Sequence, residues 1–247
     1  MSRILVILLL FLLLTVSQSV EASRYVKLTQ FSTENGLKIN DIVSILQDDD
    51  GYLWISTNEG LTRFDGYRMS TIASPNDDLA NYGAELVWQD SHGTLWFGSN
   101  AGNNYALDKG KNSLREIKLT VPSKYKVEHP ILTRAVEQED GNIWFASYGE
   151  LFYFHRNKND FQFVLSIEDL FEDPDLEHLI RDLLIVDNYL IIATSKGAYA
   201  FNTFTRQTKL INHLPESAQS KDQMNVKSLH LSDGQQVLFG TVSGLYT

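Results

Sequence analysis

Residues 47–57 read QDDDGYLWIST, and this pattern decides the fold because it returns twice. Residues 89–99 read QDSHGTLWFGS, and residues 137–147 read EQEDGNIWFAS. Each copy places a glycine in a short polar turn, with a tryptophan inside the β-prone run that follows. Similarity at a fixed period of about 20 to 50 residues is typical of repeat architectures. The chain is therefore expected to consist of copies of one structural unit.

The tryptophans set the period of this repeat. Trp54, Trp96 and Trp144 are 42 and 48 residues apart. Two weaker copies centre on Ile191 and Leu238, each 47 residues beyond the copy before it. About five repeats are visible, near residues 40–72, 84–119, 131–165, 180–211 and 224–247.

Each repeat contains short β-prone runs bounded by Gly, Asp and Asn. In the first repeat these runs are Ile42 to Leu46, Leu53 to Thr57, Leu61 to Phe64 and Arg68 to Ile72. Asp50-Gly51, Asp140-Gly141 and Asp233-Gly234 are expected to form hairpin turns in which glycine adopts positive φ at little cost, and His92-Gly93 replaces this pair once. Four strands per repeat predict an all-β fold, a β-propeller of four-stranded antiparallel blades. The segment from Ile167 to Leu184 is expected to be a helical insertion between blades.

Composition excludes several classes of function. The 247 residues, 43% of them hydrophobic, can fill a core, whereas 31 acidic against 21 basic side chains give a net charge of −10. Such a chain repels phosphate backbones, so nucleic acid is not an expected partner. Disulfides, thiolate catalysis and cysteine-ligated zinc are excluded because the chain has no cysteine.

The N-terminal residues have the pattern of a signal peptide. A cation at Arg3 precedes the apolar run from Ile4 to Val16, and Val20 and Ala22 supply small residues for cleavage after Ala22. A run of this length is too short to span about 30 Å of hydrocarbon comfortably, although a retained anchor is the alternative. Residues 1–22 are predicted to be a signal peptide that exports a β-propeller of residues 23–247.

The residues of the first repeat resemble a known family. The segment from Phe31 to Asp65 reads FSTENGLKINDIVSILQDDDGYLWISTNEGLTRFD, and it is similar to the two-component regulator propeller repeat. This resemblance is specific over the first three copies and degraded in the last two. It implies the periplasmic sensor region of a bacterial hybrid two-component or diguanylate cyclase protein, anchored in the inner membrane when complete. The chain is therefore expected to be a fragment that lacks the output module.

The resemblance also implies more blades than five. Family propellers generally have seven blades in a ring, so the five repeats are expected to be an incomplete ring of a larger propeller. The alternative is a closed five-bladed ring, in which residues 25–31 supply the missing outer strand of the last blade. Closure would remove a sheet edge that is otherwise exposed.

Six residues occupy two positions that recur in each of the first three repeats, and they are expected to be structural. Trp54, Trp96 and Trp144 invite comparison with an aromatic sugar-binding platform, but a residue that recurs in mid-strand is expected to pack between sheets. Gly51, Gly93 and Gly141 are expected to shape the turns.

No catalytic or metal-binding pattern is present. The histidines at 92, 129, 155, 178, 213 and 230 occur singly, without metal-ligand spacing, and the chain has no nucleophile elbow or phosphate-binding glycine loop. The acidic turn Asp48-Asp49-Asp50 lacks the spacing of a calcium loop, since it closes at once into a hairpin. The chain is therefore not expected to be an enzyme or to bind a cofactor.

Candidate ligand-binding residues follow from propeller geometry. The innermost strand of each blade lines the channel, and the outer-to-inner connections crown one face, where binding usually resides. Charged residues are unusual on innermost strands, and the connections at 73–83, 120–130, 166–178 and 212–225 are long. The inner-strand candidates are Glu85, Arg134, Arg181 and Lys227, and the loop aromatics are Tyr82, Tyr125 and Phe171.

Three functions remain open. The favoured one is an extracytoplasmic sensor that binds a small-molecule ligand, with oligosaccharide the favoured class, and passes the signal to a downstream module or a homodimer partner. The second is a protein-interaction scaffold. The third is an exported carbohydrate-active lyase or hydrolase, which 31 acidic residues leave possible without selecting a catalytic pair.

Overall fold

A computed structural model of the chain describes residues 28–108, 113–170, 179–211 and 225–247. The chain divides into residues 1–31 and residues 32–247. In the first unit only residues 28–31 are described, and they form no helix or strand. The predicted signal peptide and Tyr25 to Lys27 of the predicted closing strand lie outside the described residues, so the signal peptide stays a prediction. The following paragraphs concern the second unit.

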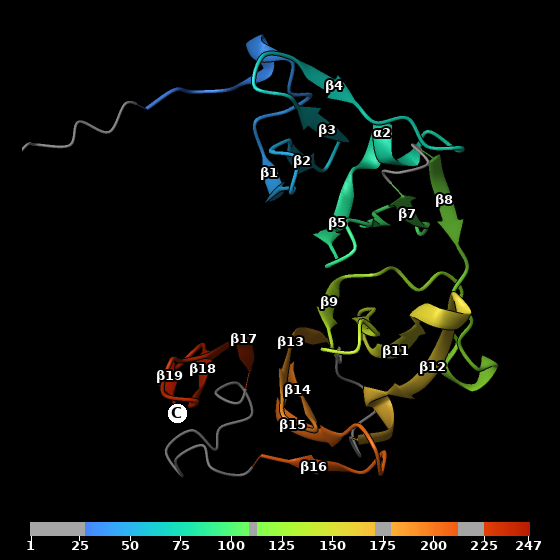
Figure 1. Ribbon diagram of the computed structural model, residues 1–247, viewed down its shortest axis with the longest axis vertical. Coiled ribbons are helices and arrows are strands. Elements are labelled where there is room, and N and C mark those ends of the chain that lie inside the picture. Colours follow the sequence, from blue (N-terminus) through green and yellow to red (C-terminus); the bar gives the residue numbers. More distant parts are fainter. Residues whose placement is uncertain (1–27, 109–112, 171–178, 212–224) are drawn as a thin grey trace, which may run out of the picture. The chain divides into compact units, whose positions relative to one another are not determined.

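The first two sheets are antiparallel and four-stranded, and their strands pair in chain order (Figure 1). The first follows the short 3₁₀ helix η1 (Thr33–Asn35) and consists of β1 (Ile42–Gln47), β2 (Leu53–Thr57), β3 (Gly60–Phe64) and β4 (Met69–Thr71). The helix α2 (Asp78–Tyr82) leads to the second, β5 (Ala84–Gln89), β6 (Leu95–Ser99), β7 (Asn104–Asp108) and β8 (Ser113–Ile117). The four runs expected in the first repeat are confirmed as strands.

The remaining sheets repeat this arrangement. The third sheet contains β9 (Arg134–Glu137), β10 (Ile143–Ala146), β11 (Glu150–His155) and β12 (Asp160–Ser166). Three 3₁₀ helices accompany it: η2 (Ser123–Tyr125) precedes β9, η3 (Arg156–Lys158) connects β11 to β12, and η4 (Ile167–Leu170) follows β12. The fourth contains β13 (Ile180–Val186), β14 (Tyr189–Thr194), β15 (Gly197–Asn202) and β16 (Thr208–Leu210). The fifth contains β17 (Val226–Leu231), β18 (Val237–Thr241) and β19 (Gly244–Tyr246).

This architecture confirms an all-β propeller fold with an incomplete ring. Contacts join the first strands of consecutive sheets, β1 with β5, β9 with β13 and β13 with β17. The fifth sheet contains three described strands, and none of the described residues adds a fourth. No helix among the described residues is long and apolar enough to cross a membrane.

The predicted helical insertion from Ile167 to Leu184 is wrong at both of its described ends. Residues 167–170 form a single 3₁₀ turn, and residues 180–184 belong to β13. The apolar residues of β13 pair with β14, as when Leu183 faces Ile192, so sheet pairing prevails over the apparent helical period. Residues 171–178 lie outside the described part.

The register of the sheets shows why the repeat has its pattern. The central residue of each copy lies on the second strand and pairs with an equivalent residue of the first strand. These pairs are Leu46 with Trp54, Trp88 with Trp96, Val136 with Trp144, Leu184 with Ile191 and His230 with Leu238. The weak fourth and fifth copies therefore occupy the same register as the first three.

The tryptophans pack between sheets, as expected. Trp54, Trp96 and Trp144 are each 1% exposed. The Trp54 ring lies 5.4 Å from the ring of Phe97 in the second sheet, and the Trp96 ring lies 5.0 Å from that of Phe145 in the third. Each hydrophobic cluster is shared by two consecutive sheets. Burial of these rings therefore holds neighbouring sheets together.

The turns between the first and second strands also follow the prediction, with one correction. Gly51, Gly93 and Gly141 have φ of 86°, 80° and 80°. In the turn between β17 and β18, however, the residue with positive φ is Gln235 at 58°, not Gly234. The N–H of Gln235 donates to the carbonyl of Ser232, so the turn begins one residue later than the Asp-Gly pair suggests.

Candidate functional site

Backbone bulges mark the beginning of several inner strands. The pairing of β5, β13 and β17 shifts between residues 84 and 86, 180 and 182, and 226 and 228. The extra residues are Glu85, Arg181 and Lys227, three of the four inner-strand candidates. Arg134 lies one register position further along, opposite Ala146. Bulges redirect side chains and are frequent next to binding sites, so the strand starts are a reasonable place for one.

Arg134 connects the second, third and fourth sheets at this end. Its Nε donates to the carbonyl of Arg181 at 2.6 Å, and its Nη1 donates to the carbonyl of Thr133 at 2.6 Å. The Nη1 lies 3.8 Å from Oε1 of Glu85, and the two side chains are 38% and 33% exposed. The ion pair is therefore long and accessible to solvent, which makes it weak.

Arg181 has a nitrogen without a hydrogen bond. Its Nε is buried, and no described residue accepts a hydrogen bond from it. The residue as a whole is only partly buried. A buried N–H that lacks an acceptor costs about 1–3 kcal/mol, so this arrangement is not one that favours folding.

Tyr148 lies near Glu85 and belongs to the same group of residues. This tyrosine was not among the candidates identified from the sequence. It lies in the turn between β10 and β11, and its ring is 48% exposed. Burial, followed by the nearby carboxylate of Glu85, raises the pKa of its hydroxyl. The equivalent turn residues are Asn58, Asn100, Ser195 and Val242, so an aromatic residue that occurs only in the third repeat was the available signal.

We call Glu85, Arg134, Tyr148 and Arg181 the inner-strand cluster. It combines two guanidinium groups, one carboxylate and one half-exposed aromatic ring. The fourth inner-strand candidate, Lys227, is exposed at the bulge of β17, the same position that Arg181 occupies on β13.

The two loop tyrosines lie elsewhere. Tyr82 is 55% exposed at the end of α2, where its carbonyl accepts a hydrogen bond from Asn100. Tyr125 is buried, its ring lies 5.3 Å from that of Phe163, and its hydroxyl donates to Asp169 at 2.5 Å. Tyr125 therefore secures the connection before β9. Phe171 lies outside the described residues, as do residues 171–178 and 212–224 of the long connections.

Asp78 fixes the connection that carries Tyr82. Its carboxylate is buried and accepts hydrogen bonds from Ser74, from Tyr105 at 2.8 Å and from Asn103 at 3.0 Å. Burial opposes ionisation, yet these hydrogen bonds hold the pKa of Asp78 below its ordinary value. Burial and the bond to Asp78 raise the pKa of Tyr105 to about 12. These groups are satisfied within the fold.

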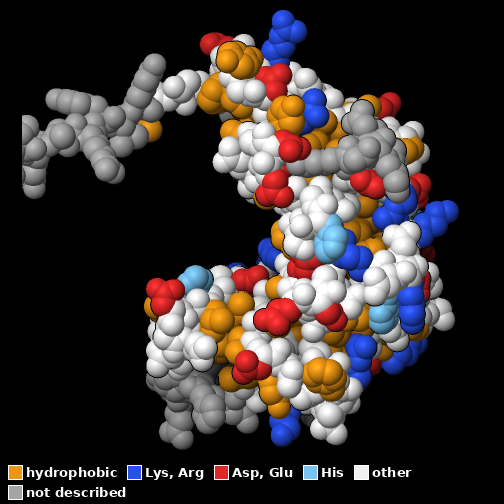
Figure 2. Space-filling view, viewed as in Figure 1, with side chains coloured by type: hydrophobic (Ala, Val, Ile, Leu, Met, Phe, Trp, Pro, Cys, Tyr) orange, Lys and Arg blue, Asp and Glu red, His pale blue; other side chains and the backbone are white. Residues whose placement is uncertain are grey.

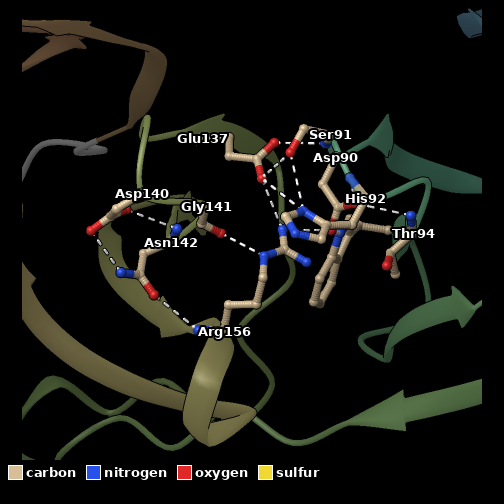
Figure 3. Close-up of polar contacts among 10 residues, drawn as sticks. Asp90, Ser91, His92, Thr94, Glu137, Asp140, Gly141, Asn142 and Arg156 are labelled. Carbon is tan, nitrogen blue, oxygen red and sulfur yellow. Dashed lines mark hydrogen bonds and ion pairs between the residues drawn. The ribbon is translucent and has the colours of Figure 1, made fainter.

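A second polar group lies at the opposite end of β5 (Figure 3). Nη2 of Arg156 donates to Oδ2 of Asp90 and to Oε1 of Glu137, each at 2.9 Å, and Nε donates to the carbonyl of Gly141 at 2.7 Å. Oδ2 of Asp90 also accepts a hydrogen bond from the indole of Trp96 at 2.9 Å. We call Asp90, Glu137 and Arg156 the clasp.

The clasp is closed by the turn that follows β5. Oδ1 of Asp90 accepts from the backbone of His92 and Thr94 at 3.0 and 2.9 Å. Ser91 donates to Glu137 through its backbone at 2.7 Å and through its hydroxyl at 2.8 Å. The clasp is therefore a densely bonded structural joint between the second and third sheets.

An acidic hollow of about 1010 Å³ lies beyond the ends of the inner strands of the third, fourth and fifth sheets. Apolar residues of β9, β13 and β17 contribute to its wall. Its acidic lining residues are Glu137, Glu139, Asp140 and Asp187. On the face displayed in Figure 2, Asp and Glu side chains lie beside hydrophobic ones over these sheets. In the part of the chain that the structure describes, no three His, Asp or Glu side chains are grouped to hold a metal ion.

Comparison with known families identifies one repeat. Residues 36–59 match the family described as Two component regulator propeller. They include Gly36, which caps η1, and the whole of β1 and β2, and they lie within the segment from Phe31 to Asp65 on which the resemblance rested. A search of curated proteins found no match to this chain.

Solved structures agree with the fold. The extracellular domain of the putative hybrid two component system BT4673 from B. thetaiotaomicron is 17% identical with a TM-score of 0.66, and the match covers 83% of this chain and 26% of that one. The corresponding domain of BT3049 from the same organism is 20% identical with a TM-score of 0.66, covering 88% and 30%. Virginiamycin B lyase from Staphylococcus aureus is 15% identical with a TM-score of 0.57, covering 83% and 69%. This chain thus spans less than a third of the two sensor-system domains, and at these identities the likeness shows the fold.

Proposed function

Because the chain carries a two component regulator propeller repeat, we propose that it is the extracytoplasmic sensory propeller of a bacterial signal-transduction protein. It lies in the periplasm, exported by the predicted signal peptide, and belongs to a protein anchored in the inner membrane. It binds a small molecule, with oligosaccharide the favoured class. Support comes from the matched repeat and from a fold shared with extracellular domains of hybrid two component systems.

The observation that carries the proposal is the inner-strand cluster. Its Arg134–Glu85 pair is long and partly exposed, and Arg181 has an unpaired Nε. A half-exposed aromatic ring beside charged hydrogen-bonding groups suits a sugar, whose apolar ring faces stack on aromatic side chains while its hydroxyls form hydrogen bonds. The clasp offers no such opportunity, because its principal groups already bond to one another.

Sensing requires that the ligand prefer one arrangement of the sheets. A ligand with equal affinity for two arrangements shifts neither population. The cluster joins three consecutive sheets through Arg134, so a ligand that replaces its contacts with Glu85 or Arg181 changes how those sheets are tied. A downstream module or a homodimer partner then receives the change.

Thermal stability in the presence of sugars tests this proposal. The protein expressed from Met1 is melted against a panel of neutral and acidic oligosaccharides, since a ligand bound only by the native state raises the melting temperature. We expect one sugar class to raise it in the wild type but not in the Tyr148→Ala variant. A cooperative melt that no sugar shifts would contradict a sugar sensor and favour the scaffold. Turnover of a sugar by the purified protein would favour the lyase or hydrolase.

A further inference from the structure

Local charge distinguishes the inner-strand cluster from the rest of the chain. The cluster holds two guanidinium groups against the single carboxylate of Glu85, and Lys227 adds a third cation at the equivalent bulge. The adjacent Asp182, whose two oxygens accept from the backbone of Leu183 at 2.9 Å and Leu229 at 2.8 Å, lowers this excess but leaves the cations in the majority. The chain as a whole carries −10, so a cationic cluster is unusual in it.

The guanidinium of Arg181 indicates which chemical group of a ligand it would bind. A guanidinium presents Nε and a terminal nitrogen in one plane, which matches the two oxygens of a carboxylate or of a sulfate ester. A sugar hydroxyl supplies one oxygen and no charge. Arg134 already donates to two carbonyl oxygens and is thereby held in place beside Arg181, which adds positive potential without competing for the same acceptor.

Because Nε of Arg181 is buried, binding of an anion to it requires the side chain to change conformation. Nε is covered by the protein and lacks an acceptor, so an anion reaches it only when the guanidinium turns outward. This movement relieves the unpaired N–H, which is unfavourable while it stays buried without an acceptor. The ligand would therefore favour one position of Arg181 over the other, as a sensor requires.

From these observations we infer that the sensed oligosaccharide is acidic and that Arg181, assisted by Arg134, binds its carboxylate or sulfate ester. Tyr148 covers a sugar ring at the margin of the same site. The inference rests on the proposed function and narrows its ligand to one class. Carboxylate and sulfate share the required pair of oxygens, so experiment must distinguish them.

Titration calorimetry with three matched probes tests the inference on the protein expressed from Met1. The probes are tetragalacturonate, its fully methyl-esterified form and a sulfated galactan tetrasaccharide. We expect one acidic probe to bind, the esterified probe to bind at least about tenfold more weakly, and binding to weaken as salt is raised. Preference for tetragalacturonate indicates carboxylate, and preference for the sulfated probe indicates sulfate.

Variants assign the anion to Arg181. Arg181→Ala should weaken binding of the acidic probe about tenfold to a hundredfold, and Arg181→Lys should weaken it less, because it keeps the charge but loses the paired donors. Arg115→Ala, which removes an exposed arginine of β8, is the matched control and should leave binding unchanged. The melting temperature of each unliganded variant shows whether it folds.

Failure has two distinguishable forms. If the esterified probe binds as tightly as the acidic ones, or if Arg181→Ala binds as the wild type does, the inference is wrong and the sugar sensor stands. If none of the three probes binds and no sugar of the wider panel raises the melting temperature, both the inference and the sugar sensor are wrong.

Discussion

The second and third sheets are joined at both ends of β5 by an arginine of the third sheet and a carboxylate of the second. At the end of β5, Arg156 meets Asp90 at 2.9 Å, with side chains 19% and 0% exposed. At its start, Arg134 lies 3.8 Å from Glu85, with side chains 38% and 33% exposed. The same pair of residue types is thus a satisfied joint in one place and a loose, accessible contact in the other. An ion pair therefore serves as a structural contact when its groups are buried and hydrogen-bonded on all sides. When its groups are partly exposed and far apart, they can bind a ligand instead.

The largest effect is expected from Asp90→Ala. This change removes the acceptor of the buried Trp96 indole, of two partly buried backbone N–H groups and of the partly buried Arg156. Loss of one partner of a buried pair costs about 3–5 kcal/mol. Urea denaturation measures the loss, with exposed Asp160→Ala as the control. A loss under about 1 kcal/mol would show that the clasp is not a joint.

Glu150→Gln tests a buried carboxyl that accepts a long hydrogen bond, of 3.4 Å, from the backbone N–H of Gly149. Glu150 is 4% exposed, and burial raises its pKa, so the native state holds its proton more tightly than the unfolded state does. Its unfavourable effect is therefore absent below the ordinary carboxyl pKa and develops as pH rises toward the native pKa. Glutamine imitates the protonated form. We expect the variant to be more stable than the wild type at pH 7 and equally stable at low pH.

The pH dependence of the melting temperature, recorded for both proteins, checks this expectation. A Glu150→Gln variant that is less stable than the wild type at pH 7 would mean that the ionised carboxylate is favoured in the native state. Exposed Glu116→Gln on β8 serves as the matched control and should show no such pH-dependent difference.

A moderate gain is expected from Gln138→Asp. Asp48 and Asp90 each accept a hydrogen bond from the tryptophan six residues later, at 2.8 and 2.9 Å, whereas Gln138 occupies this position before Trp144. The Nε1 of Trp144 is buried without a partner. An aspartate should supply the acceptor and stabilise the protein by about 1 kcal/mol. Denaturation midpoints measure the gain, and it should vanish when Trp144→Phe is combined with it; a gain that survives this change would have another cause.

The smallest effect on stability is expected from Arg134→Ala. Its ion pair with Glu85 is long and solvent-exposed, and such pairs contribute about 0–1 kcal/mol. The midpoint of urea denaturation should therefore fall less than in Asp90→Ala, although the hydrogen bonds of Arg134 to the carbonyls of Thr133 and Arg181 are also lost, while sugar binding weakens. A destabilisation as large as that of Asp90→Ala would make this contact a second clasp.

Much of this fold could be predicted because its determinants repeat. Trp54, Trp96 and Trp144 recur in the same register, and the hairpin glycines Gly51 and Gly93 recur with positive φ. The inner-strand charges could be predicted as departures from the repeat. The turn at Gly234 could not, because the turn begins at Ser232 and therefore places Gln235, not the glycine, at the residue with positive φ.

The side-chain contacts between sheets were harder to predict. Asp90 and Arg156 are 66 residues apart, and nothing in either repeat identifies its partner. Tyr148 lies in a turn whose equivalent position is not aromatic in the other repeats. That difference is the only sign in the repeat pattern that this residue could be functional. Only the three-dimensional arrangement brings Tyr148 near Glu85.

Parallel measurement of stability and sugar affinity for Arg156→Ala and Arg134→Ala tests the central claim most directly. We expect opposite outcomes: Arg156→Ala lowers the free energy of unfolding and keeps the wild-type affinity for the best acidic oligosaccharide, whereas Arg134→Ala lowers the free energy of unfolding less and weakens the affinity. Equal losses of both quantities in the two variants would contradict it, since the two ends of β5 would then serve the same role.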